Sequence, residues 1–186
     1  LNNPMSITPM SPTRAVWEEL QTWVNSRWKN LRRLGHFSVE INRESVETLL
    51  NGKPMPSLPP LDLSQASMGI GLHPSVVTAD RLEVLRFISD ELRISFRCCG
   101  SSALSLIEVA MGETDGYVAL GDSTWDVMAG LPILGNLGVS HTIDWDRTHL
   151  DAKLRFACGS KEFLAKVRPL LESVGDSPMS SGVAHG

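Results

Sequence analysis

Residues 100–130 constrain the fold of this chain more than any other stretch, because they indicate a helix, a buried strand, a loop and a second helix in succession. Gly100 and the two serines after it supply a turn and hydroxyl caps, which favour the start of a helix. The apolar residues that follow fall on one helical face, and they are Ala103, Leu106, Ile107 and Ala110. The sequence therefore predicts a helix that ends at Gly112.

The second half of this stretch predicts a buried strand that leads into another helix. The strand covers residues 116–120, and Asp122 and Ser123 are both residue types that cap helices. Asp126 falls in the first turn of the new helix, where the helix dipole favours an acid whether or not that acid takes part in chemistry. Asp126 therefore has two interpretations, a structural cap and a functional carboxylate.

Residues 94–130 resemble the second signature of the inositol monophosphatase family of magnesium-dependent phosphatases. In that family an aromatic residue, an Asp and a pair of small residues open a helix, and this pattern corresponds to Trp125, Asp126 and residues 127–130 here. The resemblance implies that Asp126 is a metal ligand and that Mg²⁺ is the cofactor. It also implies that the partner is a small-molecule phosphate ester, an inositol or sugar monophosphate, and that a homodimer can form.

The turn made by Gly100, Ser101 and Ser102 is similar to the substrate-contacting turn of the same family. Hydroxyl groups and free amides at the start of a helix can also bind a phosphate or a polyol on physical grounds. An ordinary helix cap has the same residues, so the sequence alone leaves both interpretations open. No catalytic residue is assigned.

The resemblance covers about residues 46–172 and implies an α/β layered sandwich, of which this chain would hold the C-terminal sheet with flanking helices. We expect a non-matching arm and helix over residues 1–35, the family-like portion over residues 36–175 and a disordered tail over residues 176–186. Further periodic segments predict strands at 37–41, 44–50, 66–70, 94–98, 139–143 and 154–157, and helices at 80–92 and 161–174, the last interrupted by Pro169.

Departures from the family pattern bear on activity. The family's first signature, a D-P-x-D-G-T type of loop with an upstream acidic pair, carries most of its metal ligands and does not occur in these 186 residues. The family often has a substrate-binding Glu seven residues before its metal-binding Asp, and that position is Ala119 here. Pro132 lies inside the helix predicted to carry Asp126, where we expect it to kink the chain.

These departures predict the C-terminal part of a phosphomonoesterase that is inactive as an isolated chain. The alternative is a catalytically silent, truncated relative that acts as a binding or dimerisation module. The first residue is Leu1, which favours a fragment or a processed product.

Composition excludes several other classes of protein. The formal net charge of −4 gives no basic surface for nucleic acid, and we expect no nucleic-acid partner. No apolar run reaches the length of a membrane span and no signal peptide is visible, so we expect no membrane partner. The 3 cysteines, with Cys98 and Cys99 adjacent, favour reduced thiols in a cytoplasmic protein.

Overall fold

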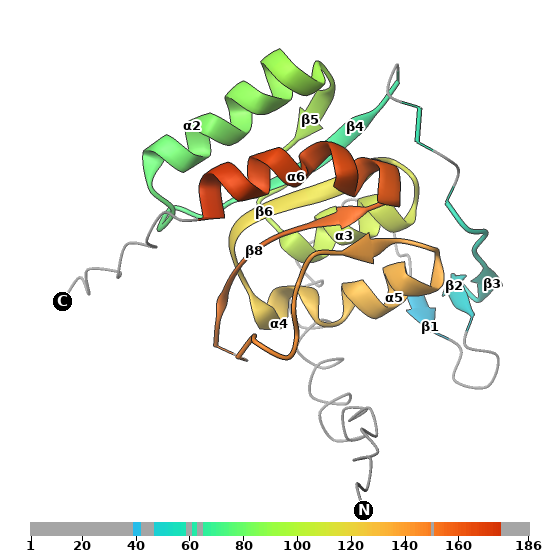
Figure 1. Ribbon diagram of the computed structural model, residues 1–186. Helices are drawn as coiled ribbons and strands as arrows, with labels where there is room; N and C mark the ends of the chain where they lie inside the picture. Colours follow the sequence, from blue (N-terminus) through green and yellow to red (C-terminus); the bar gives the residue numbers. More distant parts are fainter. Residues whose placement is uncertain (1–38, 42–46, 59–60, 63–64, 150, 176–186) are drawn as a thin grey trace, which may run out of the picture. The chain divides into compact units, whose positions relative to one another are not determined.

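Five strands between Ser67 and Gly159 form a mixed sheet in the order β5-β4-β6-β8-β7 (Figure 1). They are β4 (Ser67–Leu72), β5 (Ser95–Arg97), β6 (Gly116–Ser123), β7 (Ser140–His141) and β8 (Lys153–Gly159). The structure is a computed structural model that describes residues 39–41, 47–58, 61–62, 65–149 and 151–175. The arm and helix predicted over residues 1–35 and the tail predicted over residues 176–186 lie outside these ranges.

The directions of the strands decide where their ends meet. β4 is parallel to both β5 and β6, whereas β8 is antiparallel to β6 and to β7. The carboxyl ends of β4, β5 and β6 therefore lie at one edge of the sheet. In parallel sheets this edge is where binding sites are usually built, because the loops after the strands converge there.

Helices cover both faces of the sheet (Figure 1). One face is covered by α2 (Thr78–Arg86), its continuation η2 (Phe87–Leu92) and α6 (Lys161–Gly175). The other face is covered by α3 (Ser102–Ala110), α4 (Thr124–Val127) and α5 (Gly130–Asn136). This arrangement confirms the layered α/β architecture.

The two cores on either side of the sheet follow from alternation along β6. Val118 and Leu120 pack in the core under α2 and α6, while Tyr117 and Ala119 pack in the core under α3 and α5. Because successive side chains of a strand point to opposite faces, a strand covered on both sides is apolar at nearly every position. All of β6 is buried, as that rule requires.

A second, smaller antiparallel sheet precedes the first in sequence. It contains β1 (Val39–Ile41), β2 (Thr48–Leu50) and β3 (Lys53–Pro54) in that order. Asn51 and Gly52 join β2 to β3 with φ angles of 52° and 75°. Two successive residues with positive φ suit a tight hairpin, which explains this pair at the turn.

The two prolines inside predicted helices have different effects. The helix expected to carry both Asp126 and Pro132 is two helices, α4 and α5, with Pro132 as the third residue of α5. The interruption falls at residues 128 and 129, and residue 128 is the one whose carbonyl a proline at position 132 leaves without an amide donor, as the prediction requires. The predicted interruption of the last helix is wrong, because α6 continues through Pro169.

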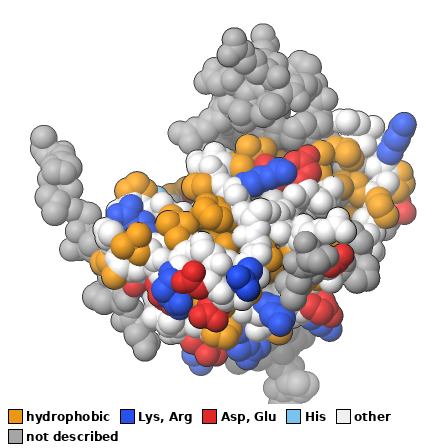
Figure 2. Space-filling view, turned by 90° about the horizontal axis from the view of Figure 1, so that it is seen from above, with side chains coloured by type: hydrophobic (Ala, Val, Ile, Leu, Met, Phe, Trp, Pro, Cys, Tyr) orange, Lys and Arg blue, Asp and Glu red, His pale blue; other side chains and the backbone are white. Residues whose placement is uncertain are grey.

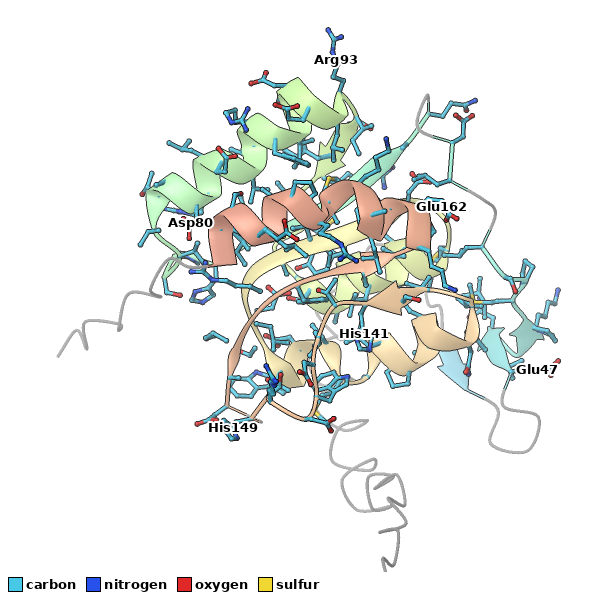
Figure 3. The ribbon with its side chains drawn as sticks, in the orientation of Figure 1. Glu47, Asp80, Arg93, His141, His149 and Glu162 are labelled. Carbon is cyan, nitrogen blue, oxygen red and sulfur yellow. The ribbon has the colours of Figure 1, made fainter. Side chains whose placement is uncertain are left out.

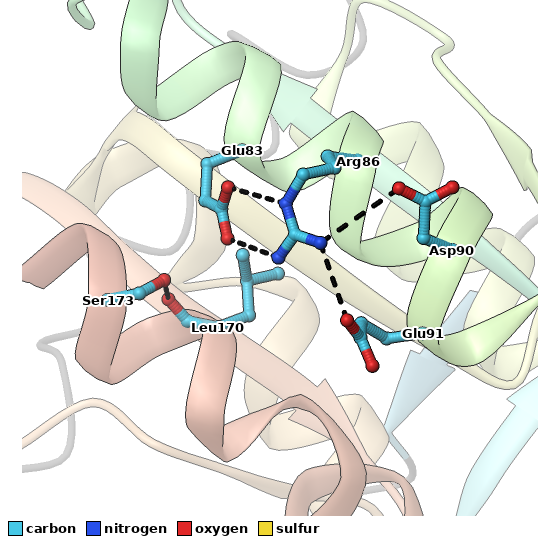
Figure 4. A network of polar contacts seen from close by, with 6 residues as sticks. All are labelled: Glu83, Arg86, Asp90, Glu91, Leu170 and Ser173. Atoms are coloured by element: carbon cyan, nitrogen blue, oxygen red, sulfur yellow. Dashed lines mark hydrogen bonds and ion pairs between the residues drawn. The ribbon is translucent and has the colours of Figure 1, made fainter.

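The outer surface of α2 and η2 carries a network of charges around Arg86 (Figure 4). Its guanidinium donates two 2.9 Å hydrogen bonds to the carboxylate of Glu83 and lies 3.9 Å from Asp90 and 3.4 Å from Glu91. Hydrogen bonding to Arg86 lowers the pKa of Glu83. Figure 2 views this side of the molecule and shows basic and acidic side chains interspersed, which is typical of a solvated face.

None of the helices among the described residues is both long enough and apolar enough to span a bilayer. The three cysteines, all of which lie in the described part of the chain, are free thiols.

Candidate functional site

The candidate site lies at the edge of the sheet where β4, β5 and β6 end. His73 follows β4, the turn at Gly100 follows β5, and Asp126 follows β6. The parallel register of these strands brings the two sequence-predicted segments to the same edge. Neither their predicted contact with substrate nor their predicted contact with metal is tested by the geometry alone.

The start of α3 is built by the Gly-Ser-Ser turn. Gly100 has a φ of 67°, a conformation that favours glycine. Ser101 is the N-cap of α3, and its hydroxyl accepts a hydrogen bond from the amide of Leu104 at 3.4 Å. Ser102 is the first residue of the helix. The predicted helix start is therefore confirmed, with Ser101 as the capping residue.

The start of α4 is held by a capping box. The amide of Ser123, the N-cap residue, donates to Oδ2 of Asp126 at 3.3 Å, and the side chain of Ser123 is paired with the backbone of residue 126 in return. The Nζ of Lys153 donates to the Ser123 hydroxyl at 2.7 Å and lies 6.0 Å from the centroid of the Trp125 ring. Asp126 thus has a structural role in addition to the one predicted for it.

The loop before β8 closes against this helix start. The Thr124 hydroxyl donates to the carbonyl of His149 at 3.1 Å. Figure 3 labels His149, which lies in the segment that leads into β8. Thr124 is buried and His149 is exposed, so the contact anchors the base of the loop and leaves the imidazole at the surface.

Asp122 differs from its predicted role as a helix cap. It belongs to β6 and is only 8% exposed. The Tyr117 hydroxyl donates to its Oδ2 at 2.8 Å. Burial raises the pKa of Asp122, and the hydrogen bonds from Ser102 and Tyr117 act against that rise.

Sequence reasoning missed this contact between Tyr117 and Asp122. A signal was present, because a glycine inside a strand pattern often marks a bulge, and Gly121 stands directly before Asp122. The pairing of β6 with β8 does shift between Leu120 and Asp122. The glycine indicates a bulge, but it does not indicate which residue the Asp122 side chain contacts.

The space around the contact is tight. A methyl group at Gly71, on the neighbouring strand β4, would overlap the Tyr117 hydroxyl and lie 3.1 Å from Oδ1 of Asp122. Ala119, which pairs with Gly71 across β4 and β6, is buried in the same core as Tyr117 and has no polar side-chain atom. The structure therefore places a carboxylate at residue 122 and none at residue 119.

A magnesium ion sets strict requirements for its ligands. Mg²⁺ demands six oxygen ligands in near-octahedral geometry, and a two-ion phosphatase site needs several converging carboxylates. Asp126 shares Oδ2 with the Ser123 amide, and Asp122 shares Oδ2 with the Tyr117 hydroxyl. Within the described ranges there is no group of three or more His, Cys, Asp or Glu side chains that could hold a metal ion. These residues by themselves do not fit a magnesium pair.

A separate cavity of about 150 Å³ lies at the opposite edge of the sheet, where β6 begins and β8 ends. Its lining includes Leu58, Thr114, Val139 and Ser160. None of the residues singled out in the sequence as substrate or metal contacts lines it, so it does not form part of the candidate site.

Comparison with known proteins is consistent with this geometry. The sequence model described as the inositol monophosphatase family matches residues 42–175. No curated protein is significantly similar to the chain in sequence.

Solved structures show the same fold. The extragenic suppressor protein suhB from Bartonella henselae is 22% identical, with a TM-score of 0.60, and the match covers 73% of this chain and 52% of that one. SuhB of Mycobacterium tuberculosis is 26% identical, with a TM-score of 0.55, over 67% of this chain and 51% of that one. Inositol monophosphatase II from Staphylococcus aureus is 24% identical, with a TM-score of 0.55, over 70% and 49%.

The chain thus spans about half of the length of each of these structures. Other matching structures were determined with inositol monophosphate, with 2'AMP, or with NADP and Ca²⁺ bound. Inositol monophosphate, 2'AMP and NADP are all phosphate esters.

Proposed function

The chain belongs to the inositol monophosphatase family, and on this premise we propose that it forms part of a magnesium-dependent phosphomonoesterase that hydrolyses inositol or sugar monophosphates. The observation that carries the proposal is the shared edge of the sheet, where the turn at Gly100 and the helix of Asp126 follow parallel strands. In this proposal Gly100, Ser101 and Ser102 contact the substrate and Asp126 binds Mg²⁺. Relatives solved with phosphate esters support the substrate class.

The start of α3 suits an oxygen-rich ligand. The first amides of a helix have no partner within the helix, and the Ser101 hydroxyl takes up one of them, that of Leu104. The remaining amides and the helix dipole favour a phosphate oxygen or a hydroxyl at this position. The residues of the turn would therefore bind and orient the ester.

We also propose that the chain on its own releases little phosphate from these esters. Asp126 supplies one carboxylate, and its Oδ2 also caps α4. A site that binds two magnesium ions would need further carboxylates beyond those that the described residues bring to this edge.

The first experiment measures magnesium-dependent phosphate release from a panel of inositol and sugar monophosphates. Wild-type protein is compared with Asp126→Asn and with Asp144→Asn, which alters an acid in the exposed loop before β8. We expect little release from any of the three. Release that requires magnesium and disappears only in Asp126→Asn would show that the chain assembles a complete site.

The second experiment measures binding, which does not require turnover. Inositol monophosphate and Mg²⁺ are added to the ¹⁵N-labelled protein, and the amide signals of residues 100–103 and of Asp126 are expected to shift. Ser173→Ala, which removes a hydroxyl on α6 that donates to the Leu170 carbonyl, is the control and should bind like wild type. An absence of shifts at residues 100–103 would contradict the proposed substrate contact.

The second candidate function is a catalytically silent relative that acts as a binding or dimerisation module. It is favoured by Ala119, which is buried and offers no acceptor for a substrate hydroxyl, and by the capping role of Asp126. Sedimentation velocity over a range of concentrations tests it. A monomer at every concentration, together with binding at residues 100–103, would favour the phosphatase site over the dimerisation module.

A further inference from the structure

We infer that the cavity of about 150 Å³, at the edge of the sheet away from the candidate site, binds a small uncharged molecule with an apolar body and a hydroxyl group. This binding site is separate from the proposed phosphatase function and does not depend on it. Three features of the cavity support the assignment: the segments that enclose it, the aliphatic side chains that line it, and one buried hydroxyl group.

Four connecting segments of the chain enclose the cavity. They are the segment after β3, the loop between α3 and β6, the turn between α5 and β7, and the residue between β8 and α6. The amide of Leu58 donates to the carbonyl of Leu137 at 3.3 Å, which attaches the first of these segments to the third. The carboxylate of Asp115 accepts a hydrogen bond from the Ser67 amide at 2.8 Å, which attaches the loop before β6 to the start of β4. Hydrogen bonds between distant parts of the sequence therefore hold the walls of the cavity.

Aliphatic side chains form a large part of the cavity lining, and they are Leu58, Leu61, Leu137 and Val139. Leu137 and Val139 belong to the core under α3 and α5, whereas Leu61 packs against the core under α2 and α6. An apolar cavity of about 150 Å³ in a protein is large enough to hold benzene. The apolar body of the bound molecule is therefore expected to be about the size of a six-membered ring.

Thr114 provides the polar contact of the cavity. This residue is 1% exposed, and its Oγ1 has no hydrogen-bond partner in the part of the chain that the structure describes. A buried hydroxyl without a partner is costly, and native proteins keep few of them. Because Thr114 lines the cavity, a molecule bound there can supply the missing partner.

The charges around the cavity exclude an anion. Among the described residues that line it there is no Lys, Arg or His, and Asp115 is the one with an ionisable side chain. A phosphate ester would thus meet a carboxylate and no compensating cation. An ammonium group would give up its water shell for a single carboxylate that already accepts from the Ser67 amide. A neutral hydroxyl suits Thr114, whose own hydroxyl can both donate and accept.

Water is the alternative occupant of the cavity. A buried water molecule is stable where roughly two to four polar groups bind it. Besides Thr114, the lining hydroxyl of Ser160 already accepts from the amide of Phe163 at 3.1 Å, as a cap of α6. A molecule with an apolar body satisfies the Thr114 hydroxyl and also fills the aliphatic part of the cavity, which water leaves poorly covered.

The test uses three probes that share a six-membered ring and differ in their polar group: cyclohexanol, cyclohexylamine and cyclohexanecarboxylate. Each is titrated into the full ¹⁵N-labelled chain. Cyclohexanol is expected to shift the amide signals of residues 112–115 and 137–139 and to leave those of residues 100–103 in place. The amine and the carboxylate are expected to bind at least about tenfold more weakly, because each would bury a charge.

Substitutions at Thr114 test the role of its hydroxyl. Thr114→Val keeps the shape of the side chain and is expected to weaken cyclohexanol binding by about fivefold to tenfold. Thr114→Ser keeps the hydroxyl and should bind within about twofold of wild type. Thr78→Val makes the same change at the exposed first residue of α2 and should bind like wild type. The comparison of the three probes uses wild-type protein, so it stands even if Thr114→Val does not fold.

Several results would overturn the inference. If cyclohexanol shifts no signal at residues 112–115 and 137–139, the cavity holds water only. Tighter binding of the amine or the carboxylate than of cyclohexanol would refute an uncharged ligand. Equal affinity of Thr114→Val and wild type for cyclohexanol would refute the contact with the Thr114 hydroxyl. None of these results depends on whether inositol monophosphate binds at residues 100–103, so the cavity and the proposed function are tested separately.

Discussion

The carboxylate of Asp126 accepts a hydrogen bond from the amide of Ser123, with 3.3 Å between Oδ2 and the amide nitrogen. The same carboxylate is the proposed magnesium ligand. One side chain therefore has a structural use that is seen directly and a chemical use that is inferred from the family. Substitutions at this position can separate the two.

Asp126→Ala is expected to lower the free energy of unfolding by about 1 kcal/mol, because α4 loses its capping box. Asp126→Asn keeps an oxygen acceptor for the Ser123 amide and is expected to cost less, although it removes the charge a metal would need. Urea unfolding of both variants and wild type measures the difference. Equal stability of Asp126→Ala and wild type would show that the capping contact contributes nothing.

Gly71→Ala is expected to destabilise the fold by about 1–3 kcal/mol, because the new methyl group would overlap the Tyr117 hydroxyl. Gly135→Ala, in α5, is the matched control, since a Cβ there meets no atom within 4 Å. That control should be neutral or stabilising by about 0.5 kcal/mol. In a Tyr117→Phe background, Gly71→Ala should lower the free energy of unfolding by less than it does in wild type. The same loss in both backgrounds would show that the methyl group does not overlap the Tyr117 hydroxyl.

Pro169→Ala is expected to stabilise the protein by about 1–3 kcal/mol, because Pro169 lies inside α6 and removes an amide from its hydrogen bonds. Pro132→Ala should change stability by less than about 0.5 kcal/mol, since the first turn of α5 has no partner for that amide. Both prolines are exposed, so packing differs little between them. Thermal and urea unfolding measure the change in stability caused by each substitution. Equal changes for Pro169→Ala and Pro132→Ala would contradict this prediction.

The three thiols are expected to react with a thiol reagent at three different rates. Cys98 is exposed and should react first. Burial raises the pKa of the Cys99 thiol, which also donates to Glu108 at 3.2 Å, so Cys99 should react more slowly. Burial raises the pKa of Cys158 to about 12, and it should react only on unfolding. Loss of the fastest phase in Cys98→Ser would confirm that Cys98 reacts first. Reaction of Cys158 in the folded protein would contradict its burial.

Stability is expected to fall as the pH drops below about 6.5, the usual pKa of an unfolded histidine, partly because of His141. Burial lowers the pKa of His141 in the folded state. His141 therefore takes up a proton at a higher pH in the unfolded chain than in the folded protein. Its contribution to stability is fully present above the unfolded pKa and is lost as the pH falls from there through the pKa in the folded protein. Urea midpoints at about pH 7.5 and 5.5 should differ less in His141→Gln than in wild type. His149→Gln, in the exposed loop, should behave like wild type.

Local rules predicted the local parts of this fold. The cap at Ser101, the helix that follows it and the strand that begins at Gly116 depend on neighbours in sequence, and each was expected where it occurs. The layered architecture followed from the alternation of helices and strands and from the family resemblance. Residues 176–186 and most of the first third of the chain lie outside the described residues, so those expectations stay predictions.

What could not be predicted depends on contacts between distant residues. Asp122 has the residue type of a helix cap, and only the bulge at Gly121 turns it toward Tyr117. Pro169 was expected to interrupt the last helix, but α6 continues through it, with Val167 and Leu170 on either side packed in the core. In both cases the residue type was informative, and contacts with residues far away in the sequence decided the outcome.

The outer strands of the five-stranded sheet are its shortest, three residues in β5 and two in β7. Unpaired backbone groups on the margin of a sheet are a template for strands of other molecules, and short or charged margins blunt that template. On β5 the guanidinium of Arg97 also pairs with Glu113 at 3.2 Å. Within the described part of the chain, the five-stranded sheet therefore offers little to edge-to-edge pairing with strands of another molecule.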